Sequence, residues 1–415
     1  MKPFPIDAVR KEFPSLSIAD DGQPRIYADN PAGTQVPQRV AQAASRCLIE
    51  SNANLGGYFR TSVLAGAQVD LAHRAMVTML GAASAAEVII AQSMTNLTFH
   101  VSRSIANMLA PGDEVVVTRM DHDGNVAPWL MMAQDRGLTV RWVDFDKDTW
   151  TILPEALDAV LTPRTRLVAL NYASNLTGSI NDIAALIERV HAAGALAYID
   201  AVQLAPHEFI DVKALGCDFL ACSSYKFFGP HLGILWGREA LLEDLVAYKV
   251  RPATNDLPSR FELGTPQIEL QAALAAAVGY FVWLGEACGG SGTPRELIQY
   301  AFAAATAYER TLASALIEGL KRFPGVTVHG IVDPARYGSR VPTVSFTHDS
   351  KSTDSIARAL AAKNIFVWSG NNYALEVVRS LGLDENSGVV RIGLAHYNTA
   401  REVQEILKAV EAAIS

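Results

Sequence analysis

The chain contains few cysteines, and their spacing is wide. Its 415 residues include four, Cys47, Cys217, Cys222 and Cys288, and no two of them form a C-x-x-C pair. Structural zinc sites commonly use such pairs, and disulfide frameworks occur mainly in short, cysteine-rich secreted chains, so the sequence indicates neither. We therefore interpret all four cysteines as reduced thiols in a core, and we expect no metal site.

Blocks of basic residues and long apolar segments are also missing. The sequence has 35 lysines and arginines against 43 acidic residues, which gives a net charge of −8 and a pI near 5.6. It lacks the basic patch by which proteins bind nucleic acids or acidic membranes. No uncharged apolar run reaches the roughly 18 residues of a membrane-spanning helix, and the charged N-terminus has no apolar leader core. We expect a cytoplasmic protein whose partners are small molecules, with no nucleic acid and no membrane among them.

The sequence does contain a regular alternation of strand and helix patterns. It is 50% hydrophobic and 19% charged, and a chain this long exceeds one core, so at least two domains are expected. Short β-rich runs alternate with Ala/Leu-rich stretches from residue 87 to 236. This pattern predicts an α/β fold with a mostly parallel sheet covered by helices on both faces. The predicted strands are 88–92, 114–118, 139–143, 166–171, 195–200, 218–221 and 233–236.

A smaller α+β domain is predicted after a glycine-rich break at residues 288–294. We interpret this break as a hinge that follows a helix over 267–286. A phosphate-binding loop is disfavoured, because no strand precedes it and no Gly-Lys-Ser/Thr follows it. We expect a large domain at 26–287, a small domain at 288–415, and residues 1–25 packed on the small one. The elements predicted after the break are helices at 295–323, 353–363 and 400–414 and strands at 326–330, 343–347, 365–369 and 389–394.

Lys226 and Asp200 form the most informative pair in the sequence. Lys226 lies between the predicted strand 218–221 and an aromatic Gly-Pro turn, and Asp200 ends the apolar run 195–199. A lysine that bonds to the cofactor and an acid that protonates its ring nitrogen are what pyridoxal 5′-phosphate (PLP) requires. A solvated surface lysine and a helix-capping aspartate are the alternatives, but this lysine is not on a polar face. We expect ligands to gather at the carboxyl ends of the strands.

Three further polar residues surround this pair in the sequence. Gln203 lies one turn beyond Asp200 and is expected to donate a hydrogen bond to the phenolic oxygen of the cofactor. The hydroxyls of Ser223 and Tyr225 lie close enough to Lys226 in sequence to hold the phosphate. The residues alone therefore predict a PLP site.

The chain resembles the class V aminotransferase family of fold-type I PLP enzymes. Within that family it is most similar to the branch of cysteine desulfurases, selenocysteine lyases and isopenicillin N epimerase-like proteins. Besides the residues above, the motifs that carry the resemblance are residues 26–33, 121–129, 258–266 and 390–399. The resemblance implies a large PLP-binding domain, a small amino-acid substrate and a homodimer.

The resemblance also assigns roles to individual residues. Thr95 would bind the phosphate at a helix start, where free N–H groups favour an anion. Thr265 would reach the phosphate bound by the neighbouring subunit. Arg391 would hold the substrate carboxylate as a bidentate partner. Asn175 would contact both cofactor and substrate.

The sequence departs from the family at the position that stacks on the cofactor ring. In cysteine desulfurases this residue is a histidine, and a gapless alignment puts Asp123 there, preceded by His122. Asp123 could act as an acid or base near the substrate carbon. Alternatively, a shift of one residue could bring His122 over the ring, or His122 could be purely structural. We keep both residues as catalytic candidates.

A second departure concerns the fate of sulfur. Tyr373 stands where the loop of many desulfurases carries a persulfide-forming cysteine, and a phenol cannot relay sulfur. We therefore expect a desulfurase-like lyase that cleaves a C–S or related β-bond without a loop persulfide. A class V aminotransferase or an epimerase is the alternative, and a non-catalytic binding homologue is a remote third. Trp368, where that loop usually has arginine, indicates a less polar substrate.

Overall fold

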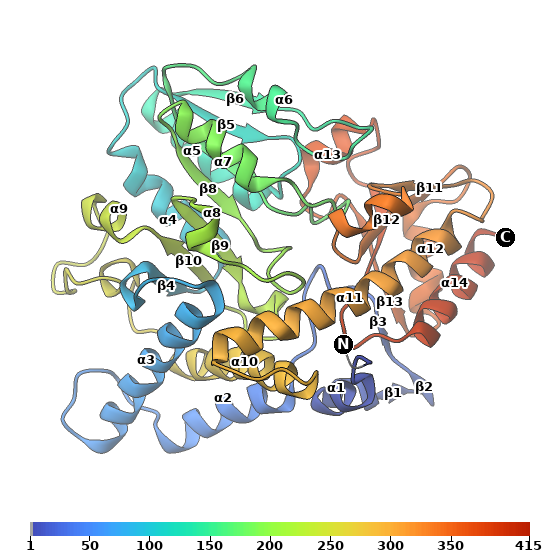
Figure 1. Ribbon diagram of the computed structural model, residues 1–415, viewed down its shortest axis with the longest axis horizontal. Coiled ribbons are helices and arrows are strands. Elements are labelled where there is room, and N and C mark those ends of the chain that lie inside the picture. The colour runs from blue at the N-terminus through green and yellow to red at the C-terminus, as the bar shows by residue number, and fades with distance from the viewer. Residues whose placement is uncertain (1–2) are drawn as a thin grey trace.

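The computed structural model describes residues 3–415, which form two main sheets with helices around them (Figure 1). The larger sheet has seven strands in the order β4-β10-β9-β8-β7-β5-β6. Among these seven strands, β10 alone runs opposite to the rest, so the predicted mostly parallel sheet is confirmed. The predicted strand ends agree with the structure to within two residues. The strands are β4 (Val88–Ala91), β5 (Glu114–Thr118), β6 (Thr139–Val143), β7 (Thr165–Asn171), β8 (Leu196–Asp200), β9 (Phe219–Ser223) and β10 (Gly233–Gly237).

Helices cover both faces of the large sheet. The covering helices are α4 (Met94–Ala106) and α5 (Ala127–Arg136) on one face and α3 (Arg60–Leu80), α7 (Ile183–Ala192) and α10 (Ile268–Ala287) on the other. Successive strand residues point to opposite faces, so Val116 belongs to the core under α3, α7 and α10, whereas Val115 and Val117 belong to the core under α4 and α5. Because both faces are buried, the strands appear in the sequence as continuous apolar runs.

A four-stranded antiparallel sheet follows later in the chain, in the order β11-β12-β15-β14. Its apolar core includes Phe346 and Ile392 and lies under three helices. The elements are β11 (Val326–His329), β12 (Thr343–His348), β14 (Trp368–Gly370), β15 (Val389–Gly393), α11 (Pro294–Leu320), α12 (Thr353–Ala361) and α14 (Ala400–Ile414).

The predicted strand 365–369 is divided into two strands in the structure, because the chain changes sheets within it. Strand β13 (Ile365–Phe366) pairs in parallel with β3 (Ile26–Tyr27) near the N-terminus, and only β14 joins the small sheet. The residue types in this run do not reveal such a change of partner, since they suit either pairing.

The long helix α11 runs from α10, beside the large sheet, to the small sheet (Figure 1). A reciprocal capping box between Thr293 and Glu296 fixes its start. Arg295 then donates to the carbonyls of Thr78, Met79 and Ile210, which belong to the large sheet and its helices. The first turn of α11 therefore lies on the large unit, and the predicted boundary at residues 287 and 288 stays a prediction.

The N-terminal segment contacts both units. Arg10 pairs with Glu402 at 2.9 Å on the small unit, and the ring of Phe13 packs edge-on against Phe228 and Tyr397. Within the described part of the predicted segment 1–25, Arg10 and Phe13 therefore contact the small unit, and Phe13 contacts the large unit as well. The remaining elements are α1 (Ile6–Glu12), β1 (Ala19–Asp20), β2 (Gln23–Pro24), α2 (Gln38–Glu50), α6 (Pro154–Asp158), α8 (Val212–Leu215), α9 (Glu239–Asp244) and α13 (Leu375–Ser380).

Within residues 3–415, α10 is the one helix whose length and composition alone would allow it to cross a membrane. Its most apolar stretch has a mean hydropathy of 1.5, and 61% of that stretch is buried inside the protein. The helix packs against α2, α3 and α11. Core helices commonly have this composition, so hydropathy alone is weak evidence for a membrane span here.

Candidate active site

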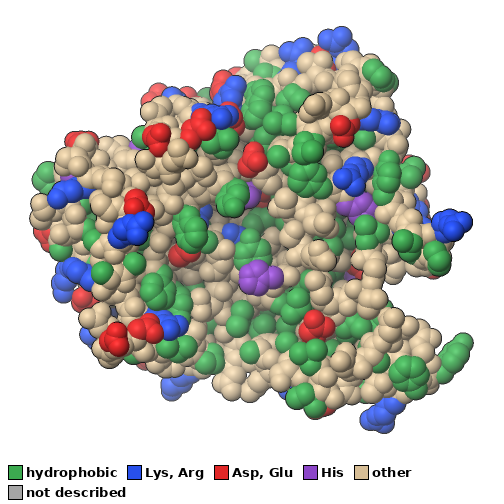
Figure 2. All heavy atoms as spheres, turned by 180° about the vertical axis from the view of Figure 1, so that it is seen from behind, with side chains coloured by type: hydrophobic (Ala, Val, Ile, Leu, Met, Phe, Trp, Pro, Cys, Tyr) green, Lys and Arg blue, Asp and Glu red, His purple; other side chains and the backbone are tan. Residues whose placement is uncertain are grey.

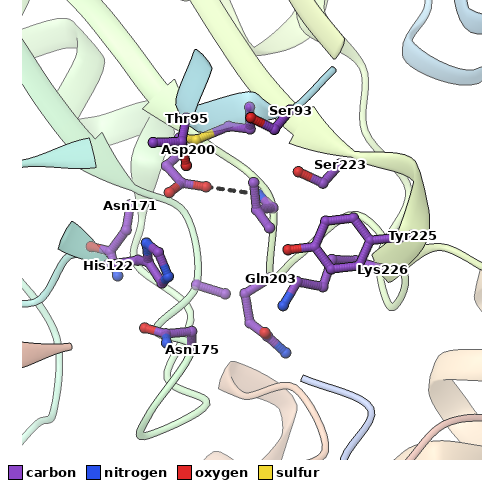
Figure 3. Close-up of a pocket in the computed structure, with 13 residues that line it drawn as sticks. Ser93, Thr95, His122, Asn171, Asn175, Asp200, Gln203, Ser223, Tyr225 and Lys226 are labelled. Atoms are coloured by element: carbon purple, nitrogen blue, oxygen red, sulfur yellow. Dashed lines mark hydrogen bonds between the residues drawn. The ribbon is translucent and has the colours of Figure 1, made fainter. Parts of the chain in front are cut away.

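Three neighbouring parallel strands end at one pocket. Strand β8 ends at Asp200, and the flanking strands β7 and β9 end at Asn171 and Ser223. The carboxyl ends of these strands therefore place three polar side chains side by side. The pocket is lined by Ser93, Met94, Thr95, His122, Asn171, Ala173, Asn175, Asp200, Val202, Gln203, Ser223, Tyr225 and Lys226 (Figure 3).

Lys226 follows β9 on a single helical turn and points into the pocket beside Tyr225 (Figure 3). Its ammonium donates to the backbone carbonyl of Pro31, in the loop after β3. Burial, together with the nearby charge of Arg391, lowers the pKa of Lys226 to about 7. A large fraction of this lysine is therefore a neutral, nucleophilic amine at neutral pH.

Asp200 lies at the base of the pocket and is only 5% exposed. One carboxylate oxygen accepts the N–H of Val202 at 2.8 Å. Burial nevertheless raises the pKa of Asp200 to about 6, because no cation is close enough to compensate fully. A carboxylate in this position can stabilise a protonated ring nitrogen.

The start of α4 forms another wall of the pocket. Ser93 caps the helix by accepting the N–H of Asn96, and Thr95 lies in the first turn. A Cβ atom at Gly233 of β10 would lie 2.1 Å from the backbone of Ser93, so glycine is needed for this close approach. The free N–H groups of the helix start, with the hydroxyls of Thr95 and Ser223, suit a phosphate.

Two buried amides have one atom without a partner in the described chain. Gln203 donates to the Thr343 hydroxyl at 3.1 Å, and Asn175 donates to the Asn372 carbonyl at 2.7 Å. The side-chain oxygen of each amide has no hydrogen-bond partner within residues 3–415. Because a buried polar atom without a partner is unfavourable, these amides indicate a polar ligand.

Arg391 reaches the same region from β15 of the small sheet. One of its Nη atoms donates to the Asn175 carbonyl at 3.1 Å, and the other lies 3.6 Å from the carboxylate of Asp29. Its Nε has no partner among the described residues. Burial lowers the pKa of Arg391 to about 10, so the guanidinium stays charged at neutral pH and can bind a carboxylate.

His122, and not Asp123, lies in the wall of the pocket. The His122 ring lies across the pocket from Tyr225 and Lys226 (Figure 3) and stacks on Tyr373 with ring centres 5.4 Å apart. Burial and the charges of Lys226 and Arg391 lower its pKa to about 3, so the ring is neutral. Asp123 lies outside the lining, and its N–H donates to the Tyr373 carbonyl. The gapless alignment that put Asp123 at the ring position therefore does not match the geometry.

Comparisons with known proteins agree with this arrangement. The family model described as aminotransferase class-V matches residues 26–406. The chain belongs to the class V aminotransferase family. An aminotransferase-like protein of Gibberella zeae is 36% identical, with 98% of each chain covered.

Several other similar proteins are named cysteine desulfurases. A probable cysteine desulfurase of Vibrio cholerae is 29% identical, with 99% of this chain and 98% of that one covered. The crystal structure of a cysteine desulfurase of Escherichia coli superimposes with a TM-score of 0.85 at 26% identity, covering 99% of this chain and 98% of the other. The predicted family and fold type are therefore confirmed.

Class V aminotransferases are PLP-dependent enzymes that act on amino acids. The pocket fits this cofactor: it offers an amine on Lys226, a buried acid on Asp200, an anion-binding helix start at Thr95 and unsatisfied amides. When bound, PLP withdraws electrons from the α-carbon of an amino acid joined to it. In this arrangement Lys226 would supply the base, Asp200 the acid at the ring nitrogen and Arg391 the group that binds a carboxylate.

Thr265 lies outside this pocket within the same chain. It is an exposed residue on the loop that follows Phe261, and it lines a separate groove with His100 and Gln271. Glu262, three residues before Thr265, accepts the N–H of Ile90 at 2.7 Å and pairs with His73 at 2.8 Å, which fixes the start of the loop. The assignment of Thr265 to the partner subunit stays a prediction.

All four cysteines are buried, and none lines the pocket described above. Burial raises the pKa of Cys217 to about 12 and that of Cys288 to about 11, and it also raises the pKa of Cys222. Thiols of this kind are poor nucleophiles at neutral pH. No cluster of three or more metal-ligating side chains occurs in the part of the chain that the structure describes.

Sequence reasoning gave no role to several groups at the site. Ser93 lines the pocket, Asp29 lies beside Arg391, and the Pro31 carbonyl accepts from Lys226. A signal was present for Ser93, since serine three residues before Asn96 is a typical helix cap. The contact between Lys226 and the Pro31 carbonyl could not be predicted, because a backbone carbonyl is present in every residue and does not depend on residue type.

Proposed function

We propose that this protein is a PLP-dependent lyase that cleaves a C–S or related β-bond of a small amino acid without forming a persulfide on itself. The observation that carries the proposal is the absence of any thiol at the pocket described here, where Tyr373 occupies the loop. Cleavage that leaves sulfur on the protein would require such a thiol within about 3–3.5 Å of the substrate sulfur.

The roles of the residues follow from their positions. Arg391 binds the substrate carboxylate and thereby orients the α-carbon toward Lys226. The amine of Lys226 accepts the α-proton, and Asp200 stabilises the protonated ring nitrogen. The neutral His122 ring, stacked on Tyr373, covers the side of the pocket that lies across from Lys226 and excludes water there.

An elimination balances without a thiol or a redox partner. The C–S bond breaks, and sulfur leaves with the bonding electron pair and takes up a proton. The remaining unsaturated amine reacts with water to give a keto acid and ammonia. With L-cysteine, the products are hydrogen sulfide, pyruvate and ammonia, one of each per substrate.

The test is a single-turnover reaction with L-cysteine, followed by alkylation and mass spectrometry of the protein. We expect free sulfide and pyruvate, and no persulfide on Cys47, Cys217, Cys222 or Cys288. The variant with all four cysteines replaced by serine should keep its rate per folded molecule. A stoichiometric persulfide on any cysteine would contradict the proposal.

A transaminase or an epimerase on the same scaffold is the second candidate. The 36% identity to an aminotransferase-like protein favours it over the 29% identity to a probable cysteine desulfurase. Product analysis separates the three: an aminotransferase consumes a keto-acid acceptor, an epimerase exchanges the α-proton for solvent deuterium with inversion, and a lyase releases sulfide. A non-catalytic binding homologue would do none of these, and the retained set of Lys226, Asp200, Gln203 and Arg391 argues against it.

We also propose that the protein acts as a homodimer in which Thr265 serves the partner's phosphate site. Exposed apolar side chains gather at the projecting α2–α3 end of the large unit, beside a notch in the surface (Figure 2). They include Leu48, Ile49, Tyr58, Phe59 and Val63. Analytical ultracentrifugation with absorbance detection of PLP checks this proposal, and a monomer that keeps its full cofactor content would contradict it.

A further inference from the structure

Strand pairing places Trp368 beside the carboxylate-binding Arg391. The two residues lie directly opposite each other on the antiparallel strands β14 and β15, and Ser345 of β12 lies on the other side of Arg391. Opposite residues of antiparallel strands point to the same face of a sheet, with Cβ atoms about 4.5–5.5 Å apart. The side chains of Ser345 and Arg391 both reach backbone carbonyls of the large unit. Trp368 therefore faces the same side, toward the pocket.

Trp368 is nevertheless 54% exposed. A tryptophan on the face of the sheet that is turned toward the pocket keeps such exposure only where the space in front of its ring is open. Its ring is therefore available to a molecule that binds Arg391, and large aromatic surfaces of this kind contribute strongly to binding when they become covered.

Tyr373 presents a second exposed ring from the same segment. It is 72% exposed, and it stacks on His122, which lines the pocket. Asn372 and Tyr373 adopt left-handed φ angles of 53° and 59°, which are unfavourable for residues with side chains. Three hydrogen bonds hold this conformation: Asn175 donates to the Asn372 carbonyl, Asp123 to the Tyr373 carbonyl, and the Tyr373 N–H to Asn371.

The charged residues near these rings already pair with one another. Glu376, just beyond Tyr373, accepts from both Arg119 and Arg379, and Arg379 also pairs with Glu385. Asp29 faces Arg391 from the other side. The segment therefore offers aromatic surface, with its Glu376, Arg379 and Glu385 charges paired, to the part of a substrate that extends away from Arg391.

We infer that Trp368 and Tyr373 form a subsite for a flat apolar group carried on the substrate sulfur. The substrate class is then an L-cysteine S-conjugate, that is, a thioether of cysteine with an aryl or benzyl group. This inference rests on the proposed lyase activity and extends it from a small amino acid to its aromatic conjugates. The reaction balances as conjugate plus water giving the aromatic thiol, pyruvate and ammonia, with the C–S bond broken and no oxidant consumed.

The kinetic test compares S-benzyl-L-cysteine with S-methyl-L-cysteine as substrates of the PLP-loaded enzyme. We expect kcat/KM to favour the benzyl conjugate by at least about tenfold, because a stacked ring adds to the burial of apolar area. Trp368→Ala should reduce this preference about tenfold, and Trp368→Phe should restore most of it. Tyr373→Ala and Tyr373→Phe should behave in the same way with smaller effects. Tyr248→Ala, which removes another exposed aromatic ring, is the matched control and should leave the preference unchanged.

A binding test isolates the subsite from catalysis. The acids 3-(benzylthio)propanoate and 3-(methylthio)propanoate lack the amino group, so they can bind Arg391 and the rings but cannot react. Isothermal titration should give a Kd about tenfold lower for the benzyl acid, and Trp368→Ala should remove this difference. Equal Kd values in wild type and Trp368→Ala would overturn the subsite and leave the lyase proposal intact. Preferential binding of the benzyl acid without release of thiol from S-benzyl-L-cysteine would support the subsite and refute the lyase.

Discussion

Two buried carboxylates on the large sheet, Glu114 and Asp200, have opposite surroundings. Glu114 is the first residue of β5, is fully inaccessible to solvent, and accepts hydrogen bonds of 2.6 to 3.0 Å from Arg141, Thr162 and Arg164. Asp200 is the last residue of β8 and accepts one backbone N–H. The pKa of Glu114 is lowered to about 2 by its partners, whereas burial raises that of Asp200 to about 6.

The difference separates the part of the sheet that maintains stability from the part that performs chemistry. Partners that fully satisfy a carboxylate lower its free energy and make it inert. At the carboxyl ends of the strands, Asp200 and Lys226 keep shifted pKa values because no such partner set is present among the described residues. Groups held in this way bind and activate a ligand at the expense of stability.

The largest effect is expected at Lys226. Replacement by alanine should abolish turnover, because the pocket then has no amine to bond the cofactor or accept the α-proton. Borohydride reduction should no longer join PLP covalently to the protein, as mass spectrometry can establish. Lys213→Ala, on the short helix α8, is the control and should keep full activity. A reduced cofactor found on a lysine other than Lys226 in wild type would refute this assignment.

Asp200→Asn should lower kcat by several orders of magnitude while leaving the fold intact. A neutral amide cannot hold a proton on the ring nitrogen, so the cofactor loses most of its ability to accept electrons. Steady-state kinetics and thermal melting of the same preparation measure the two properties. Near-normal turnover would remove Asp200 from its role.

Glu114→Gln is expected to produce the reverse pattern. It leaves the Arg141 and Arg164 guanidinium groups without their anion, so the free energy of unfolding in urea should fall by about 1–3 kcal/mol. The kcat per folded molecule should stay within about twofold of wild type, because the residue is at the other end of the strands. A loss of activity with unchanged stability would break the distinction between the two regions.

The smallest effect is in the pH dependence of the stability of the cofactor-free protein. The pKa of Asp200 is raised from 3.8 to about 6, so its stabilising contribution is complete below about pH 4 and is lost as the pH rises through 6. The pKa of Glu114 is lowered from 4.5 to about 2, so its contribution is present above about pH 4.5 and is lost as the pH falls toward 2. Urea titrations of wild type, Asp200→Asn and Glu114→Gln should show these opposite slopes, and parallel curves would contradict both assignments.

The sequence was most informative where periodicity and chemistry agreed. The strands of the large sheet were predicted to within two residues, because both of their faces are buried and the apolar runs are continuous. Lys226, Asp200, Gln203, Ser223, Tyr225, Thr95 and Asn175 were also named in advance, and all of them line the pocket. Residue type together with position at a strand end was sufficient for these.

What could not be predicted depends on contacts between distant segments. The choice between His122 and Asp123 is a matter of one residue in a turn, and only the three-dimensional path of that turn decides it. The division of residues 365–369 between two sheets requires knowledge of β3, more than three hundred residues away. The pairing of Trp368 with Arg391 on neighbouring strands likewise arises from strand register, which residue types alone do not determine.

The parallel pairing of β3 with β13 has a consequence for how the protein is made. Residues near the start of the chain, including Asn30, hydrogen-bond to Gly393 and Asn398 close to its end. During synthesis the N-terminal strand emerges from the ribosome first but must wait for its partners until almost the whole chain has followed. The large sheet is complete earlier, so Lys226 is in place before the Pro31 loop that contacts it is anchored. We therefore expect a newly made chain to acquire its cofactor only after the segment that contains Gly393 and Asn398 has left the ribosome.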